Sequence, residues 1–224
     1  ITNSDGKLAL LNNNGALDIT KTAKVSNTGA GTTNIENHGI NGINVYGGIT
    51  SEGDLTMTNT GDKGILVDSS ARVNGNNNIS ISNNAVGGTN IKGLVNAGKD
   101  VNISNSNSNV VIGDNTENNN YISAGKDINI SVDNGNILNY GVEKTLLAAD
   151  GNLNMNVTNG TIGSSVQQTG ASKNSTGIGP KSQGTRDFTK SINGNIKGKV
   201  NTLTTDKANT GNDLVINYAA IDSD

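Results

Sequence analysis

The sequence predicts an all-β fold, a right-handed parallel β-helix with three short strands in each coil. Three observations predict it: a strand pattern that recurs along the chain, an abundance of turn-forming residues, and a scarcity of aromatic ones. The 224 residues include 41 Asn and 30 Gly, which tolerate the left-handed backbone conformations of tight turns. One Phe and four Tyr are the only aromatic residues, so the core must be aliphatic.

The repeated pattern is clearest in residues 97–104, AGKDVNIS, and 124–131, AGKDINIS. Six segments share a template in which an apolar residue is followed six positions later by an apolar, polar, apolar, small polar run. The apolar positions are Leu11/Leu17/Ile19, Ile49/Leu55/Met57, Val73/Ile79/Ile81, Val95/Val101/Ile103, Ile122/Ile128/Ile130 and Leu147/Leu153/Met155. Alternation with a period of two predicts a half-buried strand. We therefore expect both apolar residues of each run to point inward, and the residues between them to point outward, namely Asp18, Thr56, Ser80, Asn102, Asn129 and Asn154.

The short gap inside the template is typical of a bend between two strands, because five residues cannot form a crossover helix. A third apolar cluster follows each run, at Val25, Ile65/Val67, Val86, Val110/Ile112, Ile137/Leu138 and Ile162. Three strands in each repeat predict a solenoid whose stacked coils bury one aliphatic column. The 38 residues between Leu11 and Ile49 leave two alternatives open, namely two short coils or one coil with an insertion.

The pattern divides the chain into three parts. Residues 1–163 carry the coils, residues 164–190 are polar and form an irregular loop or insertion, and residues 191–224 form further coils or strands. The sequence begins without Met or a signal peptide, and we expect it to be a piece of a longer protein.

The repeated Ala-Gly-Lys-Asp-Φ-Asn-Φ-Ser motif, where Φ is apolar, together with residues 151–157, GNLNMNV, resembles the filamentous haemagglutinin-like exoproteins. These are giant bacterial proteins exported by two-partner secretion. The resemblance covers residues 8–162, and residues 191–218 less well. It implies a right-handed β-helix, secreted or at the bacterial cell surface, that serves adhesion or carries an adhesin or toxin tip, with an outer-membrane transporter as partner.

The resemblance is incomplete. The secretion domain of that family carries Asn-Pro-Asn motifs, whereas the only Pro of this chain, Pro180, follows Gly179. No functional residue is carried over, because stalk repeats contain no site to match.

One column of acidic and amide residues falls at a bend of the template: Asp54, Asn78, Asp100, Asp127 and Asn152. Stacked oxygen ligands could hold calcium. The alternative is a solvated turn whose side chains bond nearby backbone groups, with Lys99 and Lys126 balancing two of the acids. We expect the turn, and neither a metal nor a cofactor.

We also expect no catalytic residue. Polysaccharide lyases and hydrolases with this fold need grouped carboxylates, and Asp18 is the only acid at an outward template position. Arg72 and Arg186 lie far apart in the chain, and His38 is the only His. Tyr46, Tyr121 and Tyr140 could line a glycan surface but are more typical of packing. Asn-x-Ser/Thr sequons begin at Asn78, Asn102, Asn129, Asn156, Asn159 and Asn174, and the repeat itself produces the first four.

A net charge of −3 with two Arg does not favour nucleic acid, and no apolar run is long enough to span a membrane. The sequence thus predicts a structural stalk or adhesive rod that binds a cell-surface receptor or glycan. Two alternatives stay open: a carbohydrate-binding or carbohydrate-cleaving β-helix, such as a lyase or tailspike, and the rod of a secreted toxin.

Overall fold

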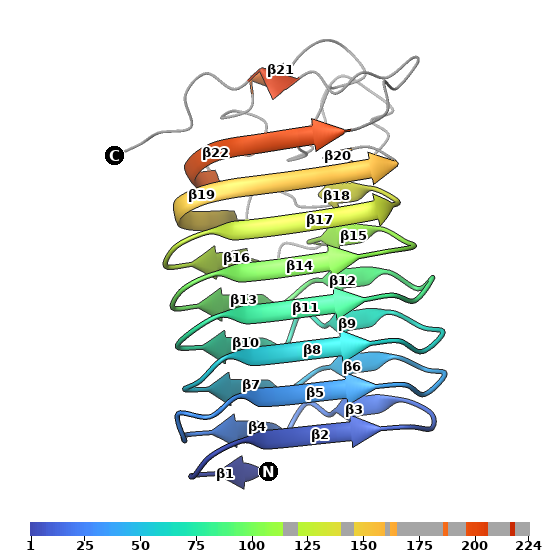
Figure 1. Cartoon of the computed structure of the whole chain (residues 1–224), viewed down its shortest axis with the longest axis vertical. Helices are drawn as coiled ribbons and strands as arrows, with labels where there is room; N and C mark the ends of the chain where they lie inside the picture. The colour runs from blue at the N-terminus through green and yellow to red at the C-terminus, as the bar shows by residue number, and fades with distance from the viewer. Residues whose placement is uncertain are drawn as a thin grey trace.

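The computed structural model describes residues 1–113, 121–139, 146–159, 162–164, 186–187, 196–205 and 216–217. It shows an all-β parallel solenoid with three strands in each coil (Figure 1), so the predicted fold class is confirmed. The handedness stays a prediction. The described residues include six coils with all three strands. They include no helix long and apolar enough to cross a membrane.

Strands of five to seven residues stack on one side of the solenoid, which we call the front face. Their side chains alternate between the core and the outer surface, as a half-buried strand requires. The strands are β2 (Leu8–Asn12), β5 (Thr33–Asn37), β8 (Leu55–Asn59), β11 (Ile79–Asn83), β14 (Val101–Asn105) and β17 (Ile128–Asn134).

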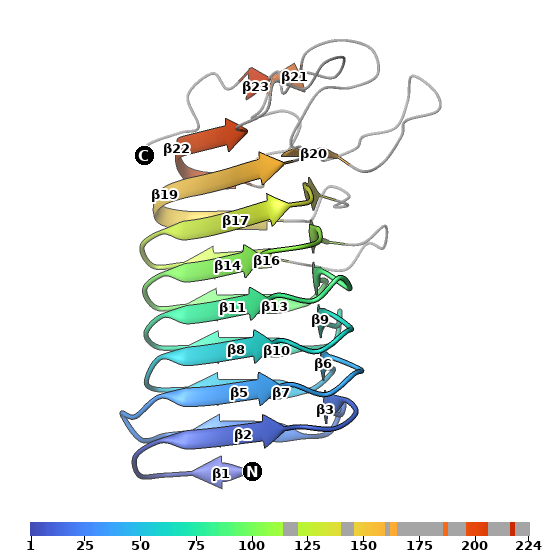
Figure 2. The ribbon, with the colours of Figure 1, turned by 45° about the vertical axis from the view of Figure 1, so that its right-hand side comes forward.

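The next strand of each coil lies on the side face, which Figure 2 shows along one edge of the stack. Its members form a seven-stranded parallel sheet. They are β3 (Leu17–Ile19), β6 (Ile43–Val45), β9 (Ile65–Val67), β12 (Thr89–Ile91), β15 (Val110–Ile112), β18 (Ile137–Asn139) and β20 (Ile162–Ser164).

The third strand of each coil lies on the rear face. These strands are β1 (Thr2–Asn3), β4 (Lys24–Asn27), β7 (Gly48–Ser51), β10 (Arg72–Gly75), β13 (Leu94–Ala97) and β16 (Tyr121–Ala124). The long strand β19 (Leu146–Asn159) pairs with both β16 and β17, so the rear and front faces join into one 14-stranded sheet. Strand β22 (Ile196–Thr205) pairs with β19, and β21 (Arg186–Asp187) pairs with β23 (Ile216–Asn217).

The predicted aliphatic column forms the core of the stack. Nine of the residues predicted to point inward from the front face are at most 1 % exposed: Leu55, Met57, Ile79, Ile81, Val101, Ile103, Ile128, Ile130 and Met155. The side chain of Leu153 lies outside the described residues. Its backbone aligns with Ile128, as the template predicts.

The first template match was assigned to the wrong face. Leu17 and Ile19 do face the core, but from β3, which pairs with β6 on the side face. Leu11 points outward and is 60 % exposed. The inward residues of the first front-face strand are instead Leu8 and Leu10.

Polar residues in the core explain why the first coils were misread. Strand β5 aligns Thr33 with Leu55, so a coil starts at a polar residue inside the 38-residue interval. Thr33 is fully buried, and its hydroxyl tolerates burial because it forms a hydrogen bond with the Ser51 hydroxyl at 2.7 Å. An alignment restricted to apolar residues cannot detect this coil.

The third apolar cluster is confirmed on the side face at Ile65/Val67, Val110/Ile112 and Ile137. Two of its members were wrong. Val25 lies on the rear face, aligned with Ile49, and Val86 lies in a loop with 73 % of its surface exposed. The strand that was expected near Val86 begins at the buried Thr89, whose hydroxyl donates to Asn105 Oδ1 at 2.7 Å.

Most of residues 164–190, predicted as a loop or insertion, lie outside the described residues. That division of the chain, with the further coils expected over residues 191–224, stays a prediction.

Candidate binding face

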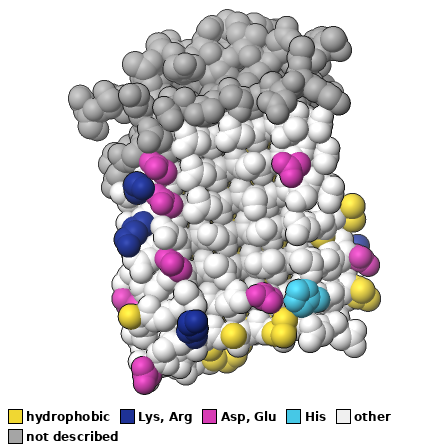
Figure 3. All heavy atoms as spheres, in the orientation of Figure 1, with side chains coloured by type: hydrophobic (Ala, Val, Ile, Leu, Met, Phe, Trp, Pro, Cys, Tyr) yellow, Lys and Arg dark blue, Asp and Glu magenta, His cyan; other side chains and the backbone are white. Residues whose placement is uncertain are grey.

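The front face carries two outward columns of small polar side chains. From β8 to β17 every residue in both columns is uncharged, and Figure 3 shows the resulting expanse of neutral surface. The first column is Asn34, Thr56, Ser80, Asn102, Asn129 and Asn154; the second is Glu36, Thr58, Ser82, Ser104, Ser131 and Asn156.

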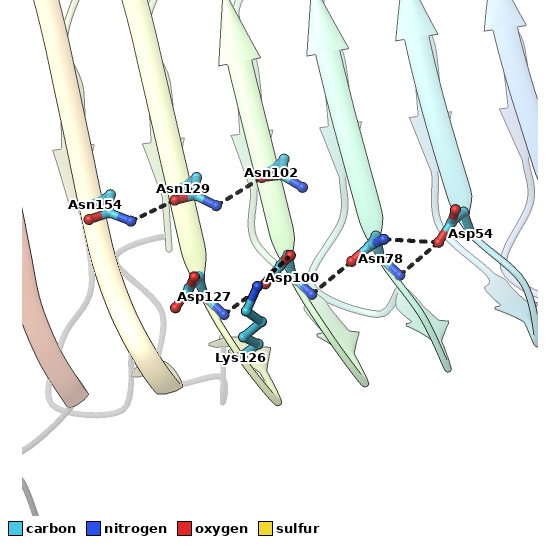
Figure 4. Close-up of polar contacts among 8 residues, drawn as sticks. All are labelled: Asp54, Asn78, Asp100, Asn102, Lys126, Asp127, Asn129 and Asn154. Atoms are coloured by element: carbon cyan, nitrogen blue, oxygen red, sulfur yellow. Dashed lines mark hydrogen bonds and ion pairs between the residues drawn. The ribbon is translucent and has the colours of Figure 1, made fainter.

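The first column forms hydrogen bonds from coil to coil (Figure 4). Asn129 Nδ2 donates to Asn102 Oδ1 at 2.9 Å, and Asn154 Nδ2 donates to Asn129 Oδ1 at 2.7 Å. Lower in the stack, the Thr56 hydroxyl donates to Asn34 Oδ1. These bonds join successive coils, so several hydrogen-bond donors and acceptors of this column are already paired within the protein.

The second column differs, because two of its hydroxyl side chains stand in solvent. Ser104 and Ser131 are exposed, whereas Thr58 and Ser82 are half-buried. A row of hydroxyl groups one strand spacing apart, about 4.8 Å, can form many weak hydrogen bonds with a partner. From Thr58 to Ser131 this column contains no acidic or basic side chain.

The predicted turn column bonds backbone groups of the next coil (Figure 4). Asp54 Oδ1 accepts from both the N–H and the side-chain amide of Asn78, each at 3.1 Å. Asn78 Oδ1 accepts from the Asp100 N–H at 3.2 Å, and Asp100 Oδ1 accepts from the Asp127 N–H at 3.0 Å. This geometry agrees with the turn interpretation.

Calcium gains no support from the same column. Within the described residues, no three His, Cys, Asp or Glu side chains form a group that could hold a metal ion. Lys126 Nζ lies 3.9 Å from Asp100 Oδ2 and is largely exposed, so this ion pair is weak. The side chain of Asn152, the last member of the column, lies outside the described residues.

The other candidate residues are not brought together. His38 is exposed in the loop after β5, with Nδ1 2.6 Å from the Thr60 hydroxyl and Nε2 3.6 Å from Glu36 Oε2. Arg72 donates to the carbonyl of its neighbour Ala71 at 2.8 Å. Tyr46 is half-buried. The side chains of Arg186, Tyr121 and Tyr140 lie outside the described residues.

Asp68 has a shifted pKa at the turn between β9 and β10. Burial alone would raise the pKa of this carboxyl group. Hydrogen bonds from the Ser70 N–H and hydroxyl, at 3.1 and 2.9 Å, outweigh burial and lower the pKa below its usual value. Because its hydrogen bonds come from its own turn, the shift indicates a structural role.

A buried asparagine ladder was missed by the sequence analysis. Asn12, Asn37, Asn59 and Asn83 end successive front-face strands, and each donates its side-chain amide to the side-chain oxygen of the next, at 2.6, 2.9 and 2.8 Å. A shorter ladder joins Asn3 to Asn27 on the rear face at 2.9 Å. The signal was present as Asn two positions after the second inward residue, in Φ-x-Φ-x-Asn. The pattern did not reveal the ladder because Asn is expected in turns or on the outward side of strands, and not at an inward position.

Comparison with protein-family models, with curated proteins and with solved structures found no match. The fold therefore rests on the strand pairing itself. The likeness to filamentous haemagglutinin-like exoproteins rests on the sequence motif.

Proposed function

We propose that this chain is part of the stalk or adhesive rod of a large secreted bacterial surface protein of the filamentous haemagglutinin-like kind. The observation that carries the proposal is that one coil pattern repeats and that side-chain hydrogen bonds join neighbouring coils. These bonds form three columns: the buried asparagine ladder, the outward amide column and the turn column. These bonds lie along the rod axis and add to the main-chain ladders.

Such a design supports a mechanical role. Each coil contacts mainly its neighbours, so the rod can lengthen by adding coils without a change of fold. Buried amides that bond in series also hold each coil in register, because a one-residue slip would leave them unpaired.

The neutral front face supports the adhesive role. Repeated hydroxyl groups can bind a receptor or a glycan through many shallow contacts, each weak and together additive. A partner held by these two columns binds with little dependence on salt, because neither column carries a charge from β8 to β17.

Adhesion of coated beads tests the proposal. Beads that carry the chain should adhere to cells or to a panel of neutral glycans, and the double variant Ser104→Glu/Ser131→Glu should reduce adhesion. The matched control is Asn74→Glu/Asn96→Glu, which adds the same charges on the rear face. Equal losses for both variants would argue against a front-face adhesive surface.

The carbohydrate-cleaving alternative needs a separate screen. Incubation with pectins, alginates and glycosaminoglycans, with and without calcium, should yield no cleavage products. Turnover that disappears on replacing one Asp would contradict the stalk and favour a lyase. A secretion domain and a transporter gene beside this coding sequence would support the exported rod.

A further inference from the structure

The described residues include four Asn-Gly pairs, which begin at Asn14, Asn41, Asn74 and Asn134. An Asn that precedes Gly is prone to deamidation, because Gly has no side chain to shield its backbone nitrogen from the Asn side chain. Asn14 lies in the first coil, where a preceding coil of a longer rod would change its surroundings. The other three pairs have a coil on both sides, so their surroundings can be compared.

Two of these three pairs are held by the fold. Asn74 and Gly75 lie in β10, which pairs with β7 on one edge and with β13 on the other. Asn134 ends β17, and its side-chain amide donates to Ser106 O at 3.2 Å, while the N–H that follows it donates to Asn159 O at 3.0 Å. At both places the chain must open locally before the Asn side chain can reach the next backbone nitrogen.

The third pair, Asn41 and Gly42, is not held in this way. It closes the loop 38–42 that joins β5 to β6 (Figure 1), and Asn41 is exposed. Among the described residues, neither the Asn41 side chain nor the Gly42 N–H forms a hydrogen bond. The Asn41 N–H donates to Gly15 O at the long distance of 3.2 Å. Gly42 itself is buried, but the attack comes from its own neighbour and needs only rotation within the loop.

The stacking of the loops requires Gly at position 42. Its φ is +75°, and a Cβ atom there would lie 2.1 Å from Gly64 O of the next coil. The equivalent loop of that coil, 60–64, also ends in Gly but carries Lys63 where this loop carries Asn41. The turn therefore needs the Gly of the reactive pair and does not need the Asn.

We propose that Asn41 is a site of spontaneous deamidation in the folded protein. The Gly42 nitrogen attacks Asn41 Cγ and closes a cyclic imide. The bond between Cγ and Nδ2 breaks, and the amide nitrogen leaves as ammonia with the proton of the Gly42 N–H. Water then opens the imide, giving Asp when it adds at Cγ and isoaspartate when it adds at the main-chain carbonyl.

Both products place a carboxylate in the loop, ionised at neutral pH, one coil from Lys63. An exposed pair of this kind contributes little stability. Isoaspartate also adds a methylene group to the main chain. The added group lies between the N–H of residue 41, which donates to Gly15 O, and Gly42 O, which accepts from the Leu17 N–H at 2.9 Å. Isoaspartate should therefore loosen this loop more than Asp does. The inference does not depend on the adhesive role.

Peptide mapping by mass spectrometry tests the site. The full chain is stored at body temperature and mildly alkaline pH, and the replacement of NH₂ by OH is followed at each Asn. Asn41 should convert about tenfold faster than Asn74 and Asn134, which react only after local opening. Isoaspartyl methyltransferase should label the stored chain and should label the variant Asn41→Lys, which copies the loop of the next coil, far less. No conversion of Asn41, or equal rates at the three residues, would overturn the proposal.

Storage of the unfolded chain shows whether the fold sets the order of reaction. In guanidinium chloride all three residues precede Gly in a flexible chain and should convert at similar rates. If Asn41 kept the same lead there, its neighbours in sequence and not its loop would set the rate, and the structural argument would be overturned. The isoaspartate form, separated by ion exchange, should also melt at a lower temperature than the variant Asn41→Asp. Equal melting temperatures would contradict the proposed effect on the main chain.

Discussion

Two regions of the solenoid differ at the third inward residue of their front-face strands. We call this position the corner. In β5, β8 and β11 the corner holds Asn37, Asn59 and Asn83, all fully buried. In β17 and β19 the aligned position holds Val132 and Val157, which are equally buried. The corner therefore accepts either a hydrogen-bonded amide or an aliphatic group of similar size.

What differs is how the strand ends. The asparagine amides also donate to carbonyls of the following turn, as Asn37 does to Gly39 O at 2.8 Å, and these strands stop at the asparagine. Strand β17 continues past Val132 to Asn134, which accepts a hydrogen bond from Asn159 at 3.0 Å in a more exposed place. The buried amide thus turns the chain in the early coils, and valine lets the strand continue in the late ones.

The aliphatic column common to both regions sets the largest expected effect. Ile130→Asp buries a carboxylate with no partner and should lower the free energy of unfolding by about 3–5 kcal/mol. Asn129→Asp, one residue away on the outer surface, removes one amide hydrogen bond and should cost about 1 kcal/mol. Urea unfolding measures both, and similar losses would show that the register is wrong.

Replacing a buried corner Asn of an early coil with Val, the residue of the late coils, should cause the next largest loss of free energy of unfolding. Asn59→Val removes the donor to Asn83 and Lys63 O and the acceptor for Asn37, leaving buried polar groups unpaired. We expect a loss of about 2–4 kcal/mol. Hydrogen exchange should speed up first in β5 and β11. A neutral result would mean that the ladder does not stabilise the coils.

The reverse exchange should cost less. In Val132→Asn the new amide can donate to Asn105 Oδ1, but it meets Val157 on its other side. One unpaired group should cost about 1–2 kcal/mol. If this variant were less stable than Asn59→Val in the same urea series, the two corners would not be interchangeable as we infer.

The smallest effect concerns acid stability at the turn of Asp68. Its folded pKa is lowered, so its carboxylate stabilises the fold above the unfolded pKa and loses this contribution as the pH falls through the folded pKa. The stability gap between the native chain and Asp68→Asn should therefore be constant near neutral pH and shrink below about pH 4. A gap that widens in acid would contradict the direction of the shift.

The fold was predictable wherever apolar residues alternate with polar ones, as in residues 101–105 and 128–132. The prediction failed where a polar residue takes an inward position, as Thr33 and Thr89 do, because each finds its hydrogen-bond partner on another strand. It also failed at Leu17 and Ile19, since short strands on different faces share the same alternation. The outward columns followed from the template, but the outward orientation of Leu11 in β2 did not.

The sequence alone determined the period of the coil and the inward and outward sides of its strands, because both are local properties of a chain that alternates polar and apolar residues. Only the tertiary structure decided which strands share a face and which asparagines are buried. Those choices depend on register between coils 22 to 27 residues apart. Over that distance a side chain such as Asn59 finds its partner through stacking, and no short-range pattern specifies it.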